Sequence, residues 1–299
     1  MRVHILGSAA GGGFPQWNCN CVNCRGMRAG SLRAKARTQC SVAVSAEGAR
    51  WILLNASPDL RQQMFSFPEL LPKGGVRGSA IEAVALTDAE LDHITGLLSV
   101  REAQSIRIYC TATVLEWTFG SNPVFGALNS PERFQVIQVE ERKTETIGCG
   151  LRVEPYFVDG KVPTFVKNPP AVCDGAVVAY KVTDMRTGSS LLHVPAIRKI
   201  DDRLPAAAAK CDCIMFDGSF WSENEMESRG AGTRTASAMG HIPISGQGGS
   251  LERLRDLSIR KIYTHINNTN PILDETSPER REVEAARWQV AEDGMDFVV

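Results

Sequence analysis

Short apolar segments of strand length recur along this 299-residue chain and constrain its fold more than any other feature. They occupy residues 3–6, 40–45, 51–55, 81–86, 106–110, 151–157, 177–183, 190–194, 213–216, 261–263 and 296–298. Helices are expected at Ser57-Pro58, over 199–210, over 249–257, and from Ser277-Pro278 to about residue 292. Strands come in batches with helices interspersed and no fixed repeat is visible. The pattern therefore predicts sheets covered by helices, in an α/β (α+β) arrangement.

Bulk properties indicate an ordinary globular protein. The sequence has no clear linker, so we expect a single domain over residues 1–299. The proline-containing segment 158–174 is either a lid over a site or a plain surface connection. A net charge of −1 gives no reason to expect a nucleic acid or an anionic membrane as partner. The N-terminal segment resembles a strand more than a signal peptide, and no apolar run could insert into a membrane, so we expect a cytoplasmic protein. Nothing decides between a monomer and a homodimer.

A cluster of polar residues follows the apolar run 81–86, where a strand would pass into a helix. Asp88, Glu90, Asp92 and His93 lie within six residues there. Carboxylates and neutral imidazoles are common oxygen and nitrogen ligands of divalent metal ions. The cluster therefore predicts a metal site with these residues in it.

Two further strand ends carry candidate ligands. Asp217 follows the run 213–216, and His265 follows 261–263. Loops at strand ends are where functional residues usually gather. Asp217 alone is equally explained as a turn or capping residue, whereas together with the first cluster it becomes a candidate metal ligand.

Three of the nine cysteines are clustered as C-x-C-x-x-C, at Cys19, Cys21 and Cys24. Three thiolates and a fourth ligand from elsewhere make a closed, structural zinc site. The alternative is three free thiols in a loop, which would be prone to oxidation. Spacing alone leaves the fourth ligand open among five histidines and the distant cysteines.

The strand-end residues resemble those of the metallo-β-lactamase superfamily, in which H-x-H-x-D-H follows a strand. Asp92-His93 match the second half of that motif, while Asp88 and Glu90 stand where it has histidines. Asp217 and His265 match later ligand positions, and His193 is the nearest candidate for a middle histidine. The resemblance implies an αββα sandwich, with two sheets packed together and helices on the outer faces.

Several longer segments are similar to the coenzyme PQQ synthesis protein B family. They are GSAAGGGFPQWNCNC at 7–21, NASPD at 55–59, GTRT at 232–235, MGH at 239–241 and HINNTNPILDE at 265–275. The resemblance implies a role in making pyrroloquinoline quinone (PQQ) from a glutamate–tyrosine precursor peptide, alongside other proteins of that pathway. The family has been described both as an iron-dependent hydroxylase of the precursor tyrosine and as a carrier of the quinone or its precursor to the periplasm.

The same resemblance implies two metal sites. The cysteine site would hold structural zinc, with His241 as its fourth ligand. The functional metal would bind Asp92, His93 and His265, with Asp217 as a further ligand. Two histidines and one carboxylate on an open ion are typical of non-haem iron oxygenases, which favours Fe(II) or another divalent metal.

Three functions follow in order of preference. The first is metal-dependent hydroxylation of the tyrosine of a Glu-Tyr precursor, with Asp88 and Glu90 holding water or accepting the phenolic proton. The second is a soluble carrier of the quinone or its precursor. The third is a metal-dependent hydrolase, against which the two missing histidines argue.

Overall fold

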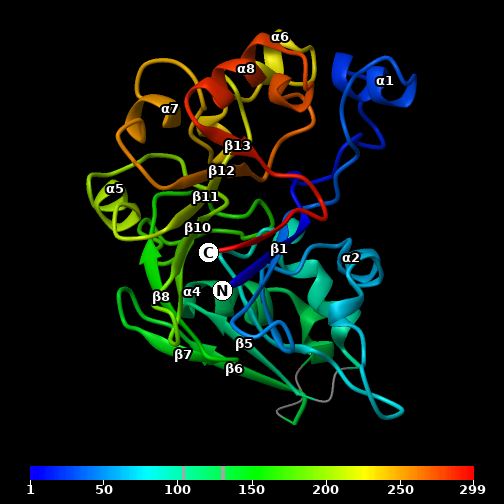
Figure 1. Cartoon of the computed structure of the whole chain (residues 1–299), viewed down its shortest axis with the longest axis vertical. Helices are drawn as coiled ribbons and strands as arrows, with labels where there is room; N and C mark the ends of the chain where they lie inside the picture. Colours follow the sequence, from blue (N-terminus) through cyan, green and yellow to red (C-terminus); the bar gives the residue numbers. More distant parts are fainter. Residues whose placement is uncertain (103–104, 129–131) are drawn as a thin grey trace.

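Two seven-stranded sheets form the centre of the molecule in the computed structural model, which describes residues 1–102, 105–128 and 132–299 (Figure 1). From edge to edge, the first sheet contains β14 (Asp296–Val298), β1 (Arg2–Gly7), β2 (Ser41–Ser45), β3 (Trp51–Leu54), β4 (Ile81–Ala85), β5 (Ile106–Cys110) and β6 (Phe134–Gln138). The second contains β13 (Trp288–Val290), β12 (Arg260–Thr264), β11 (Cys213–Asp217), β10 (Ser190–Val194), β9 (Val178–Asp184), β8 (Leu151–Phe157) and β7 (Glu145–Gly148).

Both sheets are mixed, with one parallel half and one antiparallel half. Strands β3 to β6 run parallel in the first sheet, and β10 to β13 run parallel in the second. The carboxyl ends of neighbouring parallel strands meet at one edge of a sheet. The loops after β4, β11 and β12 therefore carry their polar residues to these edges.

Short helices flank the two sheets. Those in the first half of the chain are α1 (Val22–Arg28), α2 (Leu60–Ser66), η1 (Pro68–Leu70), α3 (Leu91–Ile94), η2 (Thr95–Val100), α4 (Ala112–Leu115), the π-helical turn η3 (Glu116–Gly120) and η4 (Pro123–Leu128). Those in the second half are α5 (Arg203–Ala208), α6 (Glu225–Ser228), η5 (Ser237–Met239), α7 (Ser250–Arg253), η6 (Pro271–Leu273) and α8 (Pro278–Ala285). Figure 1 shows α6, α7 and α8 above the strands β11 to β13.

Three apolar clusters hold these layers together. Between the sheets, side chains such as Val44 and Ile52 of the first pack with Val182 and Met215 of the second. Leu60, Ile94 and other helical residues cover the outer face of the first sheet. A third cluster, to which α5 and α8 contribute, covers the outer face of the second. Alternation of inward and outward side chains along each strand gives each sheet two buried faces. The expected αββα sandwich is confirmed.

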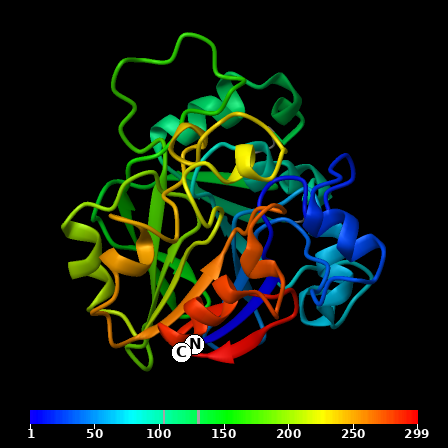
Figure 2. The same ribbon diagram turned by 90° about the horizontal axis from the view of Figure 1, so that it is seen from above.

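The chain ends pair at the edge of the first sheet. Strand β1 pairs with β14, and the amino group of Met1 donates to the carbonyl of Val299 at 2.9 Å (Figures 1 and 2). The segment 158–174 between β8 and β9 is the long green loop at the top of Figure 2. Within the described ranges, none of the helices has the length and apolar character needed to cross a bilayer.

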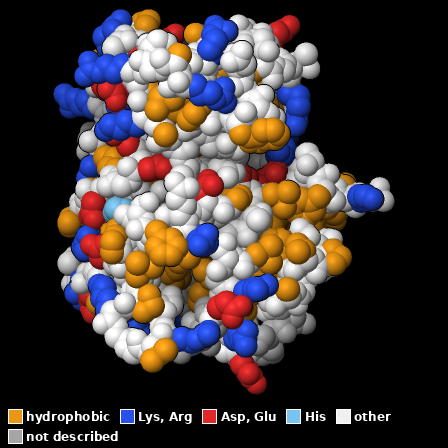
Figure 3. Space-filling model, turned by 90° about the vertical axis from the view of Figure 1, so that its right-hand side faces the viewer, with side chains coloured by type: hydrophobic (Ala, Val, Ile, Leu, Met, Phe, Trp, Pro, Cys, Tyr) orange, Lys and Arg blue, Asp and Glu red, His pale blue; other side chains and the backbone are white. Residues whose placement is uncertain are grey.

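One face of the molecule carries both signs of charge, interspersed with separate hydrophobic patches (Figure 3). The exposed large hydrophobic side chains near α1 and α2 are Trp17, Val22 and Phe65. This mixture agrees with the net charge of −1 in showing no extended field of one sign.

Expected helix boundaries needed correction at both ends of the chain. Helix α2 begins at Leu60, because Ser57 donates its hydroxyl to the side chain of Gln63 and does not cap a helix. The last helix begins at Pro278 as expected, with Ser277 as its cap, but it ends at Ala285. Helices α5 and α7 are likewise shorter than expected.

Candidate functional site

The turn after β4 is fixed by a buried pair of polar side chains. Asn55, at the end of β3, accepts a hydrogen bond from the backbone N–H of Thr87 at 2.9 Å, and its amide group donates to the Thr87 hydroxyl at 2.9 Å. Asn55 has a φ of 65°, a left-handed conformation that asparagine tolerates better than most residues. These bonds hold the backbone where the acidic segment begins.

Asp88 is committed to orienting His93. Its carboxylate lies 2.8 Å from Nδ1 of His93 and also accepts hydrogen bonds from the Thr87 hydroxyl and the Glu90 backbone N–H. The other ring nitrogen of His93, Nε2, is buried and has no hydrogen-bond partner among the described residues. A carboxylate on one nitrogen of a histidine is the usual way to direct the other toward a metal ion.

The charges of His93 and the neighbouring carboxylates stabilise one another. Burial alone would lower the pKa of His93, but the carboxylates of Asp88 and Asp92 outweigh it and raise that pKa to about 9. Burial would raise the pKa of Asp92, but the neighbouring His93 and His265 hold it well below its usual value. A positive charge among these carboxylates is therefore favoured, as a divalent cation would supply.

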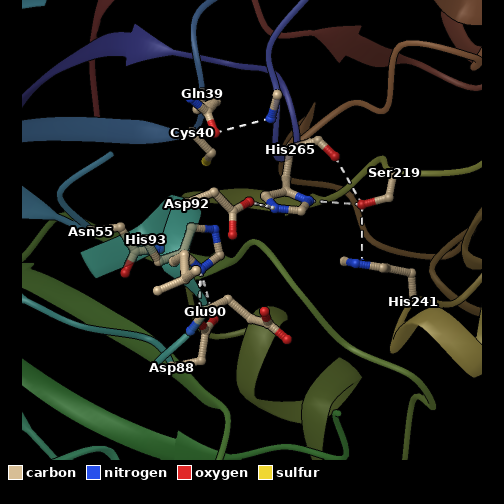
Figure 4. Close-up of polar contacts among 12 residues, drawn as sticks. Gln39, Cys40, Asn55, Asp88, Glu90, Asp92, His93, Ser219, His241 and His265 are labelled. Atoms are coloured by element: carbon tan, nitrogen blue, oxygen red, sulfur yellow. Dashed lines mark hydrogen bonds and ion pairs between the residues drawn. The ribbon is translucent and has the colours of Figure 1, made fainter. Parts of the chain in front are cut away.

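Asp92, His93 and His265 converge from the two sheets. Each offers a donor atom, and the three atoms lie within 4.8 Å of one another. Nε2 of His265 is 3.3 Å from Asp92, and its Nδ1 is 2.8 Å from the hydroxyl of Ser219 (Figure 4). His265 directly follows β12 and has a φ of 55°. The donor set of two imidazoles and one carboxylate fits a divalent metal ion such as Fe(II).

A second group shares His265. Asp217, at the end of β11, has a carboxylate oxygen 2.7 Å from Nδ1 of His241, and it accepts hydrogen bonds from the hydroxyl and N–H of Ser219. Donor atoms of Asp217, His241 and His265 also lie within 4.8 Å of one another. Asp217 thus lies close to His265, as expected of a further ligand. The third member of its group is His241, however, and Asp92 and His93 belong to the other group. In Figure 4, Ser219 lies between His241 and His265.

A cavity of about 190 Å³ opens over both groups. Its walls include Asp88, Asp92, His93, His241 and His265. Glu90 and Lys161 also line it, with 2.8 Å between the Lys161 ammonium and the Glu90 carboxylate. Figure 4 shows the Glu90 side chain extending away from Asp88 and His93.

The three clustered cysteines meet around a different partner than expected. Sγ atoms of Cys19, Cys21 and Cys24 lie within 4.8 Å of one another. The side-chain amide of Asn268 lies 3.1, 3.6 and 3.3 Å from them, respectively. His241, expected to be the fourth zinc ligand, is bound to Asp217 in the other cluster. That expectation is corrected, because the loop carrying His241 packs against the end of β11.

His193 does not join either cluster. It lies in β10, fully buried, and neither ring nitrogen has a hydrogen-bond partner within the described part of the chain. Burial lowers its pKa to about 3, so it is neutral at physiological pH. The charges of His93 and His265 also lower the pKa of His193, although His193 belongs to neither group of candidate ligands.

The structure brings together most of the residues that the sequence singled out. Sequence reasoning missed Ser219, Lys161 and Asn268. Ser219 follows the strand-end Asp217 by two residues, which is a usable signal. Asn268 lies in the distinctive segment after His265, but nothing in its spacing pairs it with cysteines so distant in the sequence.

Comparisons with known proteins give the family and the fold of this chain. A model of the β-lactamase superfamily domain matches residues 50–266. "Coenzyme PQQ synthesis protein B" of Pseudomonas putida (strain W619) is 44% identical over 301 residues, covering 99% of both chains. The crystal structure of Zn²⁺-bound PqqB from Methylobacterium extorquens superposes with a TM-score of 0.94 at 40% identity, covering 100% of both chains. A diphosphatase of the PhnP family, 18% identical over 100% of this chain and 97% of its own, shares the fold with a TM-score of 0.70.

Proposed function

This chain belongs to the coenzyme PQQ synthesis protein B family of the β-lactamase superfamily, with its role in PQQ biosynthesis, and we propose that it hydroxylates the tyrosine ring of a Glu-Tyr precursor in a metal-dependent reaction. The observation that carries the proposal is the cluster of Asp92, His93 and His265, in which the buried Nε2 of His93 has no protein partner in the described ranges.

The donor set supports Fe(II) in preference to a pair of zinc ions. One carboxylate and two imidazoles leave several positions of an octahedral ion open, as in non-haem iron oxygenases. Bound iron would supply the activation of dioxygen. The crystal structure of the related M. extorquens protein is Zn²⁺-bound, which supports binding of a divalent ion by this chain.

The size of the cavity favours a single ring as ligand. At about 190 Å³ it is smaller than the roughly 300–1,000 Å³ of pockets that enclose whole drug-sized ligands. A phenol side chain suits it better than the fused three-ring quinone would. The cavity beside the metal cluster therefore suits the isolated tyrosine ring of a precursor.

Glu90 is the best-placed residue to accept the phenolic proton. Asp88 already accepts hydrogen bonds from three groups, whereas the Glu90 carboxylate, among the described residues, pairs only with the partly exposed ammonium of Lys161. Asp217 and Ser219 hold the ring of His265 from its Nδ1 side. Hydroxylation places one oxygen atom in the ring and releases the other as water, so an external two-electron reductant is required.

A structural zinc site is proposed at the other cluster. Cys19, Cys21 and Cys24 would supply three thiolates, and Asn268 the fourth ligand. The oxygen and nitrogen of an asparagine side-chain amide are similar in size, so a half-turn of the amide group would bring its oxygen to the position of the nitrogen that faces the sulfurs. Oxygen is an accepted zinc ligand, and the buried sulfurs favour a closed site.

The test is to load the protein anaerobically with Fe(II), add Glu-Tyr, ascorbate and oxygen, and follow the dipeptide by mass spectrometry. The proposal predicts a gain of one oxygen atom, lost in His265→Ala and kept in Cys110→Ser, whose thiol is buried in the apolar cluster of the first sheet and is not part of the metal cluster. Absence of turnover together with tight binding of finished PQQ would favour the carrier instead.

A further inference from the structure

Lys161 is the one lysine or arginine among the described residues that line the metal-site cavity. Three carboxylates share that lining, those of Asp88, Glu90 and Asp92. Asp88 and Asp92 are already bound to His93 and His265. The ammonium of Lys161 is left with Glu90, at 2.8 Å, and both side chains are about a quarter exposed. An ion pair of this kind is exchangeable, because partly exposed pairs contribute little stability of their own.

The backbone of Lys161 is held at the cavity from two sides. Arg198 binds the carboxylate of Asp159 through two nitrogens, and its N–H donates to the Asp159 carbonyl at 2.8 Å. On the other side, Gly240 packs so closely that a Cβ there would lie 2.6 Å from Cβ of Lys161. Gly240 has a φ of 91° and directly precedes His241. The start of segment 158–174 is thus fixed beside the metal cluster.

A second cavity, of about 790 Å³, also has Lys161 in its lining. It lies beneath segment 158–174 and is lined also by Arg198 and Arg203. The small cavity has room for a ring, and the larger one for the rest of a peptide. Lys161 lines both cavities, and a dipeptide with its tyrosine at the metal cluster and its other residue in the larger cavity would place a carboxylate beside it.

We propose that Lys161 is the anchor for a carboxylate of the substrate, and that Glu90 occupies this position until the substrate arrives. The proposal deepens the proposed function and rests on it in taking the precursor peptide as ligand. An ammonium–carboxylate bond is charge-assisted and about twice as strong as a neutral hydrogen bond. Exchange of Glu90 for the substrate would also free the Glu90 carboxylate to accept the phenolic proton.

The experiment is calorimetric titration of zinc-loaded, anaerobic protein, in which no turnover occurs. The ligands are Glu-Tyr, Gln-Tyr and Glu-Tyr amide, which remove the side-chain and the terminal carboxylate in turn. Lys161→Met is expected to weaken Glu-Tyr binding roughly 10- to 100-fold. It should have no effect on the analogue that lacks the anchored carboxylate, whereas Lys161→Arg should keep most of the affinity. Lys167→Met, an exposed lysine of the same segment, is the matched control.

A double-mutant cycle tests the exchange with Glu90. Glu90→Gln should strengthen Glu-Tyr binding several-fold in the wild-type background, and this gain should disappear in Lys161→Met. Equal weakening of all three ligands by Lys161→Met, no weakening, or no dipeptide binding at all would overturn the anchor. If Glu-Tyr binding depends on Lys161 but the iron-loaded protein does not hydroxylate the dipeptide, only the proposed reaction is wrong. If the dipeptide is hydroxylated but its binding does not depend on Lys161, only the anchor is wrong.

Discussion

The carboxylate of Asp88 lies 2.8 Å from Nδ1 of His93, and this contact leaves Nε2 of the same ring buried without a partner among the described residues. The pair therefore acts as a unit in which one residue orients the other. Asp88 therefore supports a candidate metal ligand and does not itself face the ion. The first prediction follows from this role.

Asp88→Asn should weaken metal binding about 10- to 100-fold without unfolding the protein, because an amide holds the imidazole less firmly than a carboxylate does. Competition with a chromogenic chelator measures the affinity, and circular dichroism checks the fold. Asp159→Asn, which alters a carboxylate of segment 158–174 that lies outside the cavity of the metal cluster, is the control. Equal affinities for Asp88→Asn and the wild type would show that Asp88 does not orient His93.

Removal of a zinc ligand should lower both zinc content and thermal stability. Cys24→Ser and Asn268→Leu are expected to lose the structural ion, whereas Asn268→Asp should retain it because a carboxylate oxygen is an ordinary zinc ligand. Zinc per chain by mass spectrometry and the melting temperature give the two readouts. Cys173→Ser changes a cysteine outside the cluster and should leave both unchanged. Full zinc content in Asn268→Leu would assign the fourth position to another group.

Close packing behind His93 leaves no room for a side chain at Gly96, so a larger residue there should lower the stability of the fold. A Cβ on Gly96 would lie 2.2 Å from the backbone oxygen of Ser57, and neither backbone can move without shifting the His93 turn. Gly96→Ala should cost about 1–3 kcal/mol of unfolding free energy by overpacking. Gly126→Ala, where no atom lies within 4 Å, is the matched control. Urea denaturation of both variants measures the difference, and equal midpoints would contradict the close contact.

Glu225 should make stability depend on pH. Burial raises its pKa to about 7, although Thr269 and the backbone N–H of Trp221 bind its carboxylate. A raised pKa means that the folded state favours the neutral acid, so its stabilising contribution is complete below about pH 4.5 and is lost as the pH rises through 7. Glu225→Gln should therefore be more stable than the wild type at pH 8, by up to about 3 kcal/mol, and similar to it at pH 5. Chemical denaturation at both pH values measures this, and a pH-independent difference would refute it.

Much of the fold was predictable because its central strands are continuous apolar runs. Strands β5, β8, β10 and β14 have the predicted bounds. Strand β13 (Trp288–Val290) was wrongly predicted as helix, because no proline or glycine separates it from α8. In the structure the helix ends before Arg287, which has a left-handed φ of 61°. Strands β6 and β7 were not predicted from the sequence. They lie at sheet edges, where half-exposed side chains weaken the pattern of apolar residues by which a strand is recognised.

The site was predictable where it is local in sequence and not where distant loops meet. Asp88 and His93 contact each other because they are only five positions apart, across one turn. His241 reaches Asp217, and Asn268 reaches the cysteines, only through the packing of loops over the second sheet. Lys161 carries no signal of its own, because a lysine in a long loop is most often solvated. The cytoplasmic location and the single domain stay predictions.

The most direct test of the central claim is a reaction in ¹⁸O₂, with protein loaded with one equivalent of Fe(II), Glu-Tyr as substrate and ascorbate as the external reductant. The account predicts dihydroxyphenylalanine in the dipeptide, with one ¹⁸O atom from the gas, and no product in His93→Ala or His265→Ala. An oxygen atom taken from water, or an unchanged dipeptide in the fully loaded protein, would contradict it.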